Sequence, residues 1–246
     1  MPNLKNASIS EPFPIPPAIL RPKKKAINFA DDQVVVRVGT PSTTYRVNKQ
    51  LLCDSSEYFR AALGPKWTEG KTGLVDMPED DADAFNVYLN WVHKSKVFLD
   101  FDRMDDNGDD EHAMWELGIL IYALGDKLLD LDFKDAISDV AAIMLSTVDG
   151  LTWMPRGHEH LLYEKLARDS KLNLLLTHKY ARLSNIGDVM DESWPAGLLF
   201  NISQELLRVA KEKPVESSDN AAARCVFHEH APGAENCYRA KRGYAG

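Results

Sequence analysis

The fold of this chain is decided by a stretch that begins Asp32-Gln33-Val34-Val35-Val36-Arg37-Val38-Gly39. Its β-branched residues end at a turn residue, and residues 43–47 (Thr-Thr-Tyr-Arg-Val) form a second strand-compatible stretch. Residues 40–42 between them (Thr-Pro-Ser) suit a hairpin turn. The sequence therefore predicts two short strands joined by a turn.

Helical spacing follows the second strand. The spacing of apolar residues changes over residues 49–53, and residues 54–56 (Asp-Ser-Ser) predict a helix cap ahead of apolar residues at helical spacing. Gly64-Pro65 predicts the end of that helix, and residues 74–77 (Leu-Val-Asp-Met) predict a third strand. A long helix is then expected to begin at Pro78, because acidic residues fill its first turn and basic residues stand at its end.

Two more helices are expected over residues 113–131 and 132–144, where apolar residues recur in steps of three and four. The segment before them, residues 100–111, carries seven acidic residues in twelve. A calcium loop is one interpretation, but Arg103 would stand at its first ligand position, where a carboxylate is required. A solvated acidic insertion is therefore predicted.

Taken in order, these elements resemble the BTB (POZ) domain, in particular that of compact fungal proteins built around one. One departure is Asn48, where the family usually has His; we expect the strand-to-helix corner to survive, because Asn also forms local hydrogen bonds. The resemblance is carried, over residues 32–91, by Asp32 with its valine strand, Tyr45-Arg46-Val47-Asn48-Lys49, Leu51-Leu52, Ser56-x-Tyr58-Phe59, Trp67-x-Glu69, Leu74 to Pro78, Glu79-Asp80-Asp81 and Phe85 to Trp91.

The resemblance implies an α/β (α+β) fold, with a small mixed sheet and clustered helices, over residues 31–148. A helical extension is expected over residues 149–213 and a Cys/His-containing, flexible tail over 214–246. Residues 1–30 hold six prolines and are predicted to be a disordered arm.

The resemblance further implies a protein-binding function rather than catalysis. The family's recurrent roles are homodimer formation and bridging of substrates to cullin-RING ubiquitin ligases. Trp67-Thr68-Glu69 occupies the place of the family's hydrophobic-x-Glu motif for cullin contact; the alternative is that Trp67 is a core or loop-anchoring residue and Glu69 is solvated. A rival hypothesis is a self-associating scaffold without a cullin, with a dimer surface at Val34, Val36 and Val38.

Charge and hydropathy limit the partners. The net charge is −8, and residues 1–30 hold five Lys and Arg against one Glu, which leaves 24 basic and 36 acidic residues in the remainder. The folded part should therefore repel nucleic acid. No apolar stretch predicts a membrane span or a secretory signal, and three cysteines fit a reducing compartment, so the cytosol or nucleus is predicted.

The C-terminal third carries two further patterns. Leucines between residues 161 and 183, and a stripe after Pro195, predict helices that pack on the domain or form a partner-binding groove. The tail holds a set of potential metal ligands in thirteen residues: Cys225, His228, His230 and Cys237. Two Cys and two His suit a structural zinc, or the centre of a zinc enzyme, but they converge only if the chain bends over residues 227–232. The alternative is an unliganded hairpin or a flexible tail.

Overall fold

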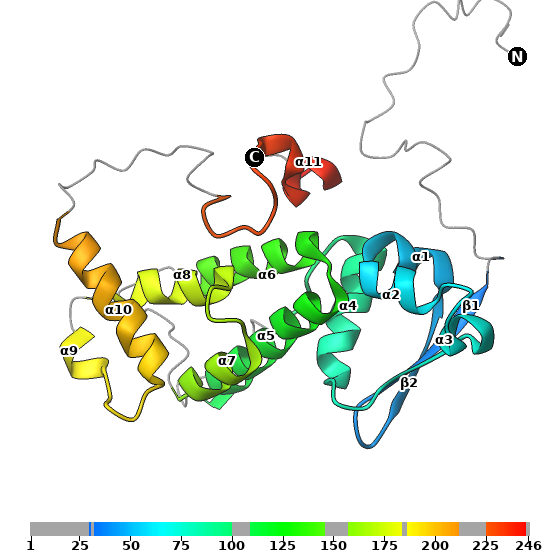
Figure 1. The fold of residues 1–246 in the computed structure, drawn as a ribbon, viewed down its shortest axis with the longest axis horizontal. Helices are drawn as coiled ribbons and strands as arrows, with labels where there is room; N and C mark the ends of the chain where they lie inside the picture. Colours follow the sequence, from blue (N-terminus) through cyan, green and yellow to red (C-terminus); the bar gives the residue numbers. More distant parts are fainter. Residues whose placement is uncertain are drawn as a thin grey trace, which may run out of the picture.

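The computed structural model describes Ala30 and residues 32–99, 109–145, 157–183, 186–211 and 225–244. Figure 1 shows an elongated molecule with a sheet at one end and a helical extension at the other, joined by long helices. Except for Ala30, the predicted arm lies outside the described residues. The same is true of the acidic insertion up to residue 108 and of the loop over residues 149–156.

The sheet has three strands, β1 (Gln33–Val38), β2 (Thr43–Asn48) and β3 (Leu74–Met77), in the order β2-β1-β3. β1 pairs antiparallel with β2, as the predicted hairpin requires, and parallel with β3. The predicted mixed α/β class with a small mixed sheet is therefore confirmed.

One face of the sheet is covered by helices. Val34, Val36 and Val38 point into the core and are at most 2% exposed. They cannot form the dimer surface predicted for them, because their side chains are buried and β1 has a partner strand on both sides. On the uncovered face, Arg37 forms a two-pronged ion pair with Asp76 of β3, at 2.5 and 2.7 Å.

Two local caps shape the helices beside the sheet, α1 (Lys49–Ser55) and α2 (Glu57–Ala62). The Asn48 side chain accepts a hydrogen bond from the Leu51 amide at 3.0 Å, so the corner with Asn in place of His is intact. Of the three residues predicted as a cap, 54–56, Ser56 caps α2 by accepting from the Phe59 amide. The short helix α3 (Thr68–Thr72) follows and leads into β3.

The long helix α4 (Ala82–Lys94) begins four residues later than predicted. Asp81, rather than Pro78, determines its start, because the Asp81 carboxylate accepts from the Ala84 amide at 2.8 Å. Phe85, Tyr88 and Trp91 form its buried face and are at most 1% exposed. This face packs the sheet end onto the central helices.

The predicted helical pair is present as α5 (Asp109–Leu128) and α6 (Leu131–Met144). Ser56 ties the two parts of the chain together by donating to the Leu128 carbonyl at 2.6 Å. Within the part of the chain that the structure describes, no helix combines the length and apolar character needed to cross a membrane.

The extension contains α7 (Glu159–Lys165), α8 (Lys171–Tyr180), α9 (Ile186–Val189) and α10 (Ala196–Val209). The single leucine-rich stretch predicted before Pro195 is two helices, because Ser170 caps a new one. The stripe predicted after Pro195 is only partly core: Ile202 is buried, whereas Leu199, Leu206 and Val209 are partly exposed. Phe200 and Leu207 of the same helix, which lie outside this stripe, are more than half exposed.

The tail does not match the expectation of a flexible segment over its described part, residues 225–244. It forms a loop, a short 3-10 helix η3 (Ala234–Asn236) and α11 (Tyr238–Arg242). Figure 1 shows this segment lying along α6.

Candidate metal centre and binding groove

The four ligand candidates of the tail come together in one cluster. Their nearest donor atoms all lie within 4.8 Å of one another: one sulfur each from Cys225 and Cys237 and one ring nitrogen each from His228 and His230. Cys237 and His228 are buried, while Cys225 and His230 are partly exposed. The cluster therefore lies at the junction between the tail and the helices below it.

The chain bends as convergence requires. The His228 amide donates to the Cys225 carbonyl at 3.1 Å, which closes a turn between the first two candidates. Gly233 then adopts a φ of +119°, which side-chain-bearing residues rarely adopt, and reverses the chain before η3. The reversal returns Cys237 to the two histidines.

The donor atoms are closely spaced. The two sulfurs of Cys225 and Cys237 are 4.0 Å apart, and the ring nitrogens His228 Nδ1 and His230 Nε2 are 3.3 Å apart. Cys237 Sγ lies 3.8 Å from His228 Nδ1. Burial raises the pKa of the Cys225 thiol, and the neighbouring Cys237 raises it further, so the apolar surroundings alone do not favour the thiolate.

The second ring nitrogen of each histidine forms a hydrogen bond outside the cluster. His228 Nε2 lies 2.9 Å from Asp139 Oδ1, and His230 Nδ1 lies 2.7 Å from the Ala231 carbonyl oxygen. Both oxygens can only accept, so both outer nitrogens are donors. Such a partner fixes the orientation and tautomer of a ligating histidine.

Asp139 of α6 holds several tail residues at once. It also accepts from the Tyr238 hydroxyl at 2.5 Å and from Arg239 Nε at 2.8 Å. Burial opposes its ionisation, but the hydrogen bonds from His228, Tyr238 and Arg239 outweigh burial and hold the Asp139 pKa below its ordinary value. The carboxylate is thus charged where the tail docks.

Glu229, between the two histidines, points away from the cluster. It accepts from the Tyr122 hydroxyl at 2.8 Å and pairs with Lys134 at 3.1 Å. Its amide donates to Asp135 Oδ1 at 2.5 Å. Alternating side chains therefore anchor this segment on the helices and leave the histidines facing the cysteines.

The acidic face of α6 is the part of the site that sequence reasoning missed. Asp132, Asp135 and Asp139 contact Lys241, the Glu229 amide and His228, respectively. Their spacing of three and four places them on one side of a helix, and a search for acidic residues on the helix's apolar face would have found this signal.

The other candidates lie away from the cluster. Trp67, at the start of α3, is 60% exposed and is therefore not a core residue, while Glu69 in the first turn of α3 is partly buried. Cys53 is a half-buried thiol in α1. His158 contacts His112, and His160 contacts the Ser193 carbonyl.

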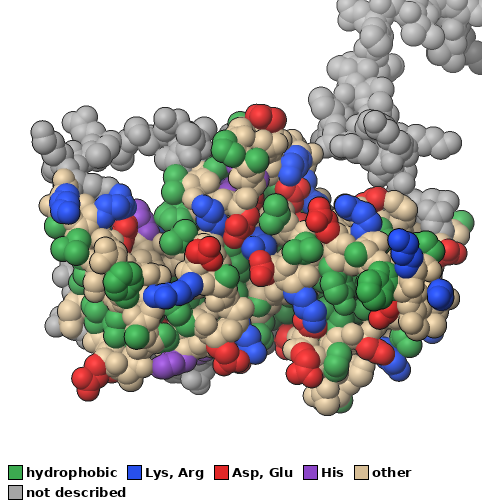
Figure 2. Space-filling view, viewed as in Figure 1, with side chains coloured by type: hydrophobic (Ala, Val, Ile, Leu, Met, Phe, Trp, Pro, Cys, Tyr) green, Lys and Arg blue, Asp and Glu red, His purple; other side chains and the backbone are tan. Residues whose placement is uncertain are grey.

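A second feature is a groove of about 1280 Å³ between α8, α10 and the start of the tail. Four of the exposed large apolar side chains of the described residues line it: Leu174, Phe200, Leu207 and Val226. Figure 2 shows hydrophobic and basic side chains together over the end of the molecule that α10 forms.

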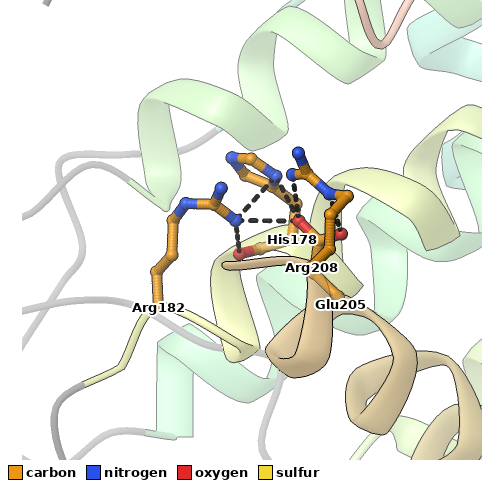
Figure 3. A network of polar contacts seen from close by, with 4 residues as sticks. All are labelled: His178, Arg182, Glu205 and Arg208. Carbon is orange, nitrogen blue, oxygen red and sulfur yellow. Dashed lines mark hydrogen bonds and ion pairs between the residues drawn. The ribbon is translucent and has the colours of Figure 1, made fainter. Parts of the chain in front are cut away.

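A charged network crosses this groove (Figure 3). Glu205 of α10 accepts from Arg182 Nη1 at 2.9 Å and from Arg208 at 2.6 and 2.7 Å, and lies 2.9 Å from His178. Hydrogen bonds from Arg208, which outweigh burial, lower the Glu205 pKa to about 2. Burial and Arg182 lower the His178 pKa, so this imidazole favours its neutral form.

Neither the comparison with protein families nor that with curated proteins finds a match for this chain.

Proposed function

We propose that this chain is a protein-interaction module of the BTB type rather than an enzyme, a homodimerising adaptor that bridges a substrate to a cullin-RING ubiquitin ligase. The order of the elements over residues 32–145, and the mixed sheet with one helix-covered face, support the BTB assignment. The adaptor role rests on the surface of the molecule.

The observation that carries the proposal is the separation of two exposed apolar surfaces. Trp67 stands beside α3 at the sheet end, whereas the groove beside α10 lies at the other end of the long axis (Figure 1). A groove that gathers several exposed apolar side chains is typical of an interaction site, and an exposed tryptophan is a residue type enriched in interface hot spots. Two such sites far apart suit a protein that holds two partners at once.

At the sheet end, Trp67 is the proposed cullin contact. Burial of an exposed indole in a partner pocket removes a large apolar area from water, and Glu69 in the same turn can fix the register. Trp67 and Glu69 occupy the place of the hydrophobic-x-Glu motif, to which the resemblance assigns the cullin contact.

At the other end, the groove suits an amphipathic segment that carries acidic residues. Its apolar lining is bordered by four basic side chains against two acidic ones, and Glu205 already contacts arginines within the molecule. Charge complementarity then favours an acidic partner, even though the chain as a whole is acidic. The basic side chains are Arg168, Lys171, Arg208 and Lys211.

The test is binding of the purified full chain to immobilised cullin N-terminal regions, with Trp67→Ala as the variant. We expect saturable binding that weakens about 30-fold or more in the variant, the loss of about 2 kcal/mol typical of a hot spot. Phe98→Ala is the matched control, because Phe98 is 50% exposed and lies outside α3.

No binding at tens of micromolar, which is about −6 kcal/mol, would reject the cullin partner. A concentration-dependent oligomer measured by sedimentation would then favour the self-associating scaffold. Its contact surface would have to lie elsewhere than at Val34, Val36 and Val38, which are buried.

A further inference from the structure

We infer that the tail cluster is a structural zinc site in which two thiolates and two imidazoles bind one Zn²⁺: Cys225, His228, His230 and Cys237. This inference does not depend on the adaptor proposal, since it rests on a different part of the chain. Zinc prefers sulfur and nitrogen donors and four-coordinate tetrahedral geometry, and the cluster supplies four such donors within 4.8 Å.

Three of the six donor separations are close to those of a tetrahedron around zinc. With Zn–S of about 2.3 Å and Zn–N of about 2.0–2.1 Å, tetrahedral ligands place two sulfurs about 3.8 Å apart, two nitrogens about 3.3 Å apart, and a sulfur and a nitrogen about 3.6 Å apart. The corresponding separations here are 4.0, 3.3 and 3.8 Å. The remaining three pairs lie within 4.8 Å, so their donor atoms must approach one another by up to about 1 Å for one ion to contact all four.

The hydrogen bonds of the histidines point to the same conclusion. Since His228 donates from Nε2 and His230 donates from Nδ1, the remaining ring nitrogens, His228 Nδ1 and His230 Nε2, face each other at 3.3 Å inside the cluster. Both nitrogens are placed to ligate a cation that also contacts the two cysteine sulfurs. The ring orientations are therefore those of ligands.

Other occupants fit the cluster less well. A disulfide requires an S–S distance of about 2.05 Å, and the two sulfurs are separated by nearly twice that. Calcium and magnesium prefer oxygen ligands, and the donors are sulfur and nitrogen. Because the protein fills all four positions, the site is closed, as in structural rather than catalytic zinc centres.

The ion would hold the tail on the central helices and complete the groove. Tyr238 follows the ligand Cys237 and packs against Trp91 of α4, with ring centroids 5.7 Å apart. Val226 and Phe227 lie between two ligands and line the groove, where Phe227 contacts His178. Removal of zinc should therefore loosen both contacts.

The first test is the zinc content of the full chain after mild chelation, followed by replacement of zinc with Co²⁺. We expect one equivalent of zinc, and visible absorption of tetrahedral Co²⁺ with a thiolate charge-transfer band. Cys237→Ser should weaken metal binding by at least about 100-fold, more than the loss of an outer hydrogen-bonding partner causes. Cys53→Ser is the matched control, because Cys53 lies in α1 and should leave binding unchanged.

Two further measurements keep the test independent of folding defects. His230→Ala removes a partly exposed ligand and should also abolish tight binding, while Asp139→Asn should weaken it by about 10–100-fold. On removal of zinc from the wild type, amide exchange should accelerate over residues 225–244 but not in β1. The inference would be overturned by a zinc content below about a tenth of an equivalent, as in adventitious binding. A disulfide between Cys225 and Cys237 in the native chain would also overturn it.

Discussion

The sheet end, residues 33–94, packs through apolar side chains, whereas the tail, residues 225–244, packs through charges, hydrogen bonds and metal-type ligands. In the sheet end, the aromatic residues of α4 and the valines of β1 are buried together. In the tail, His228, Glu229 and Arg239 form hydrogen bonds or ion pairs with charged residues of α6. These residues are Lys134, Asp135 and Asp139. The two regions of one chain are thus held by different forces.

This difference predicts the conditions of pH and metal under which each region should stay folded. Apolar burial has no preferred direction and depends little on pH or metal, so the sheet end tolerates changes in either. Hydrogen bonds to charged groups require fixed geometry and a fixed protonation state. The tail should therefore come away from the helices under conditions in which the sheet end stays folded.

The largest effect is expected from Phe85→Ala. Phe85 is fully buried between the sheet and α4, and truncation of such a side chain costs about 3–5 kcal/mol of unfolding free energy. The loss should be equal with and without a chelator, as measured by denaturant unfolding. Ile143→Ala, at a 68% exposed position, should change stability by less than about 0.5 kcal/mol. A loss that depends on the chelator would contradict the separation of the two regions.

The next effect concerns Asp130, a buried carboxyl group at the start of α6, outside both regions. It caps α6 by accepting from the Phe133 amide at 2.9 Å, and burial raises its pKa to about 6 although that bond opposes the shift. An unfolded Asp has a pKa of about 3.9, so the folded state keeps a proton that the unfolded state has lost. Stability should therefore fall as pH rises from about 4 through about 6, by about 3 kcal/mol in total.

Asp130→Asn isolates this contribution, because Asn keeps the cap but does not titrate. Unfolding free energies of both proteins measured between about pH 4 and pH 7 should show the steeper fall in the wild type. Parallel pH profiles would show that Asp130 ionises normally in the folded state.

The smallest effect is expected from Arg242→Ala in the tail. The Arg242 guanidinium lies 4.0 Å from the centre of the Trp91 ring and donates to the Ser95 hydroxyl at 2.6 Å. Loss of this contact should cost about 0.5–1 kcal/mol and should speed amide exchange in α11. Lys241→Ala is the control, since its ion pair with Asp132 is more exposed and should contribute less. Equal effects of the two substitutions would mean that Trp91 adds nothing to tail docking.

Much of the sheet end could be predicted because its signals are local. Ser56 and Asn48 cap helices through atoms only three residues away, and the β-branched run of β1 is visible in the chain itself. The start of α4 was predicted four residues early, because Pro78 and Asp81 are both good starting residues and only the hydrogen bond of Asp81 distinguishes them. The dimer surface was predicted at core residues, because a run of valines does not reveal which face of the sheet the helices cover.

The sequence by itself determined the mixed α/β class, the hairpin and the residues able to bind a metal, since each depends on residue type and short spacing. Only the tertiary structure decided that Cys225 and Cys237 meet His228 and His230. Their convergence requires the bend at Gly233 and the carboxylate of Asp139, which lies 89 residues before His228 in the chain. Contacts between distant residues depend on the packing of whole helices, and no local pattern records them.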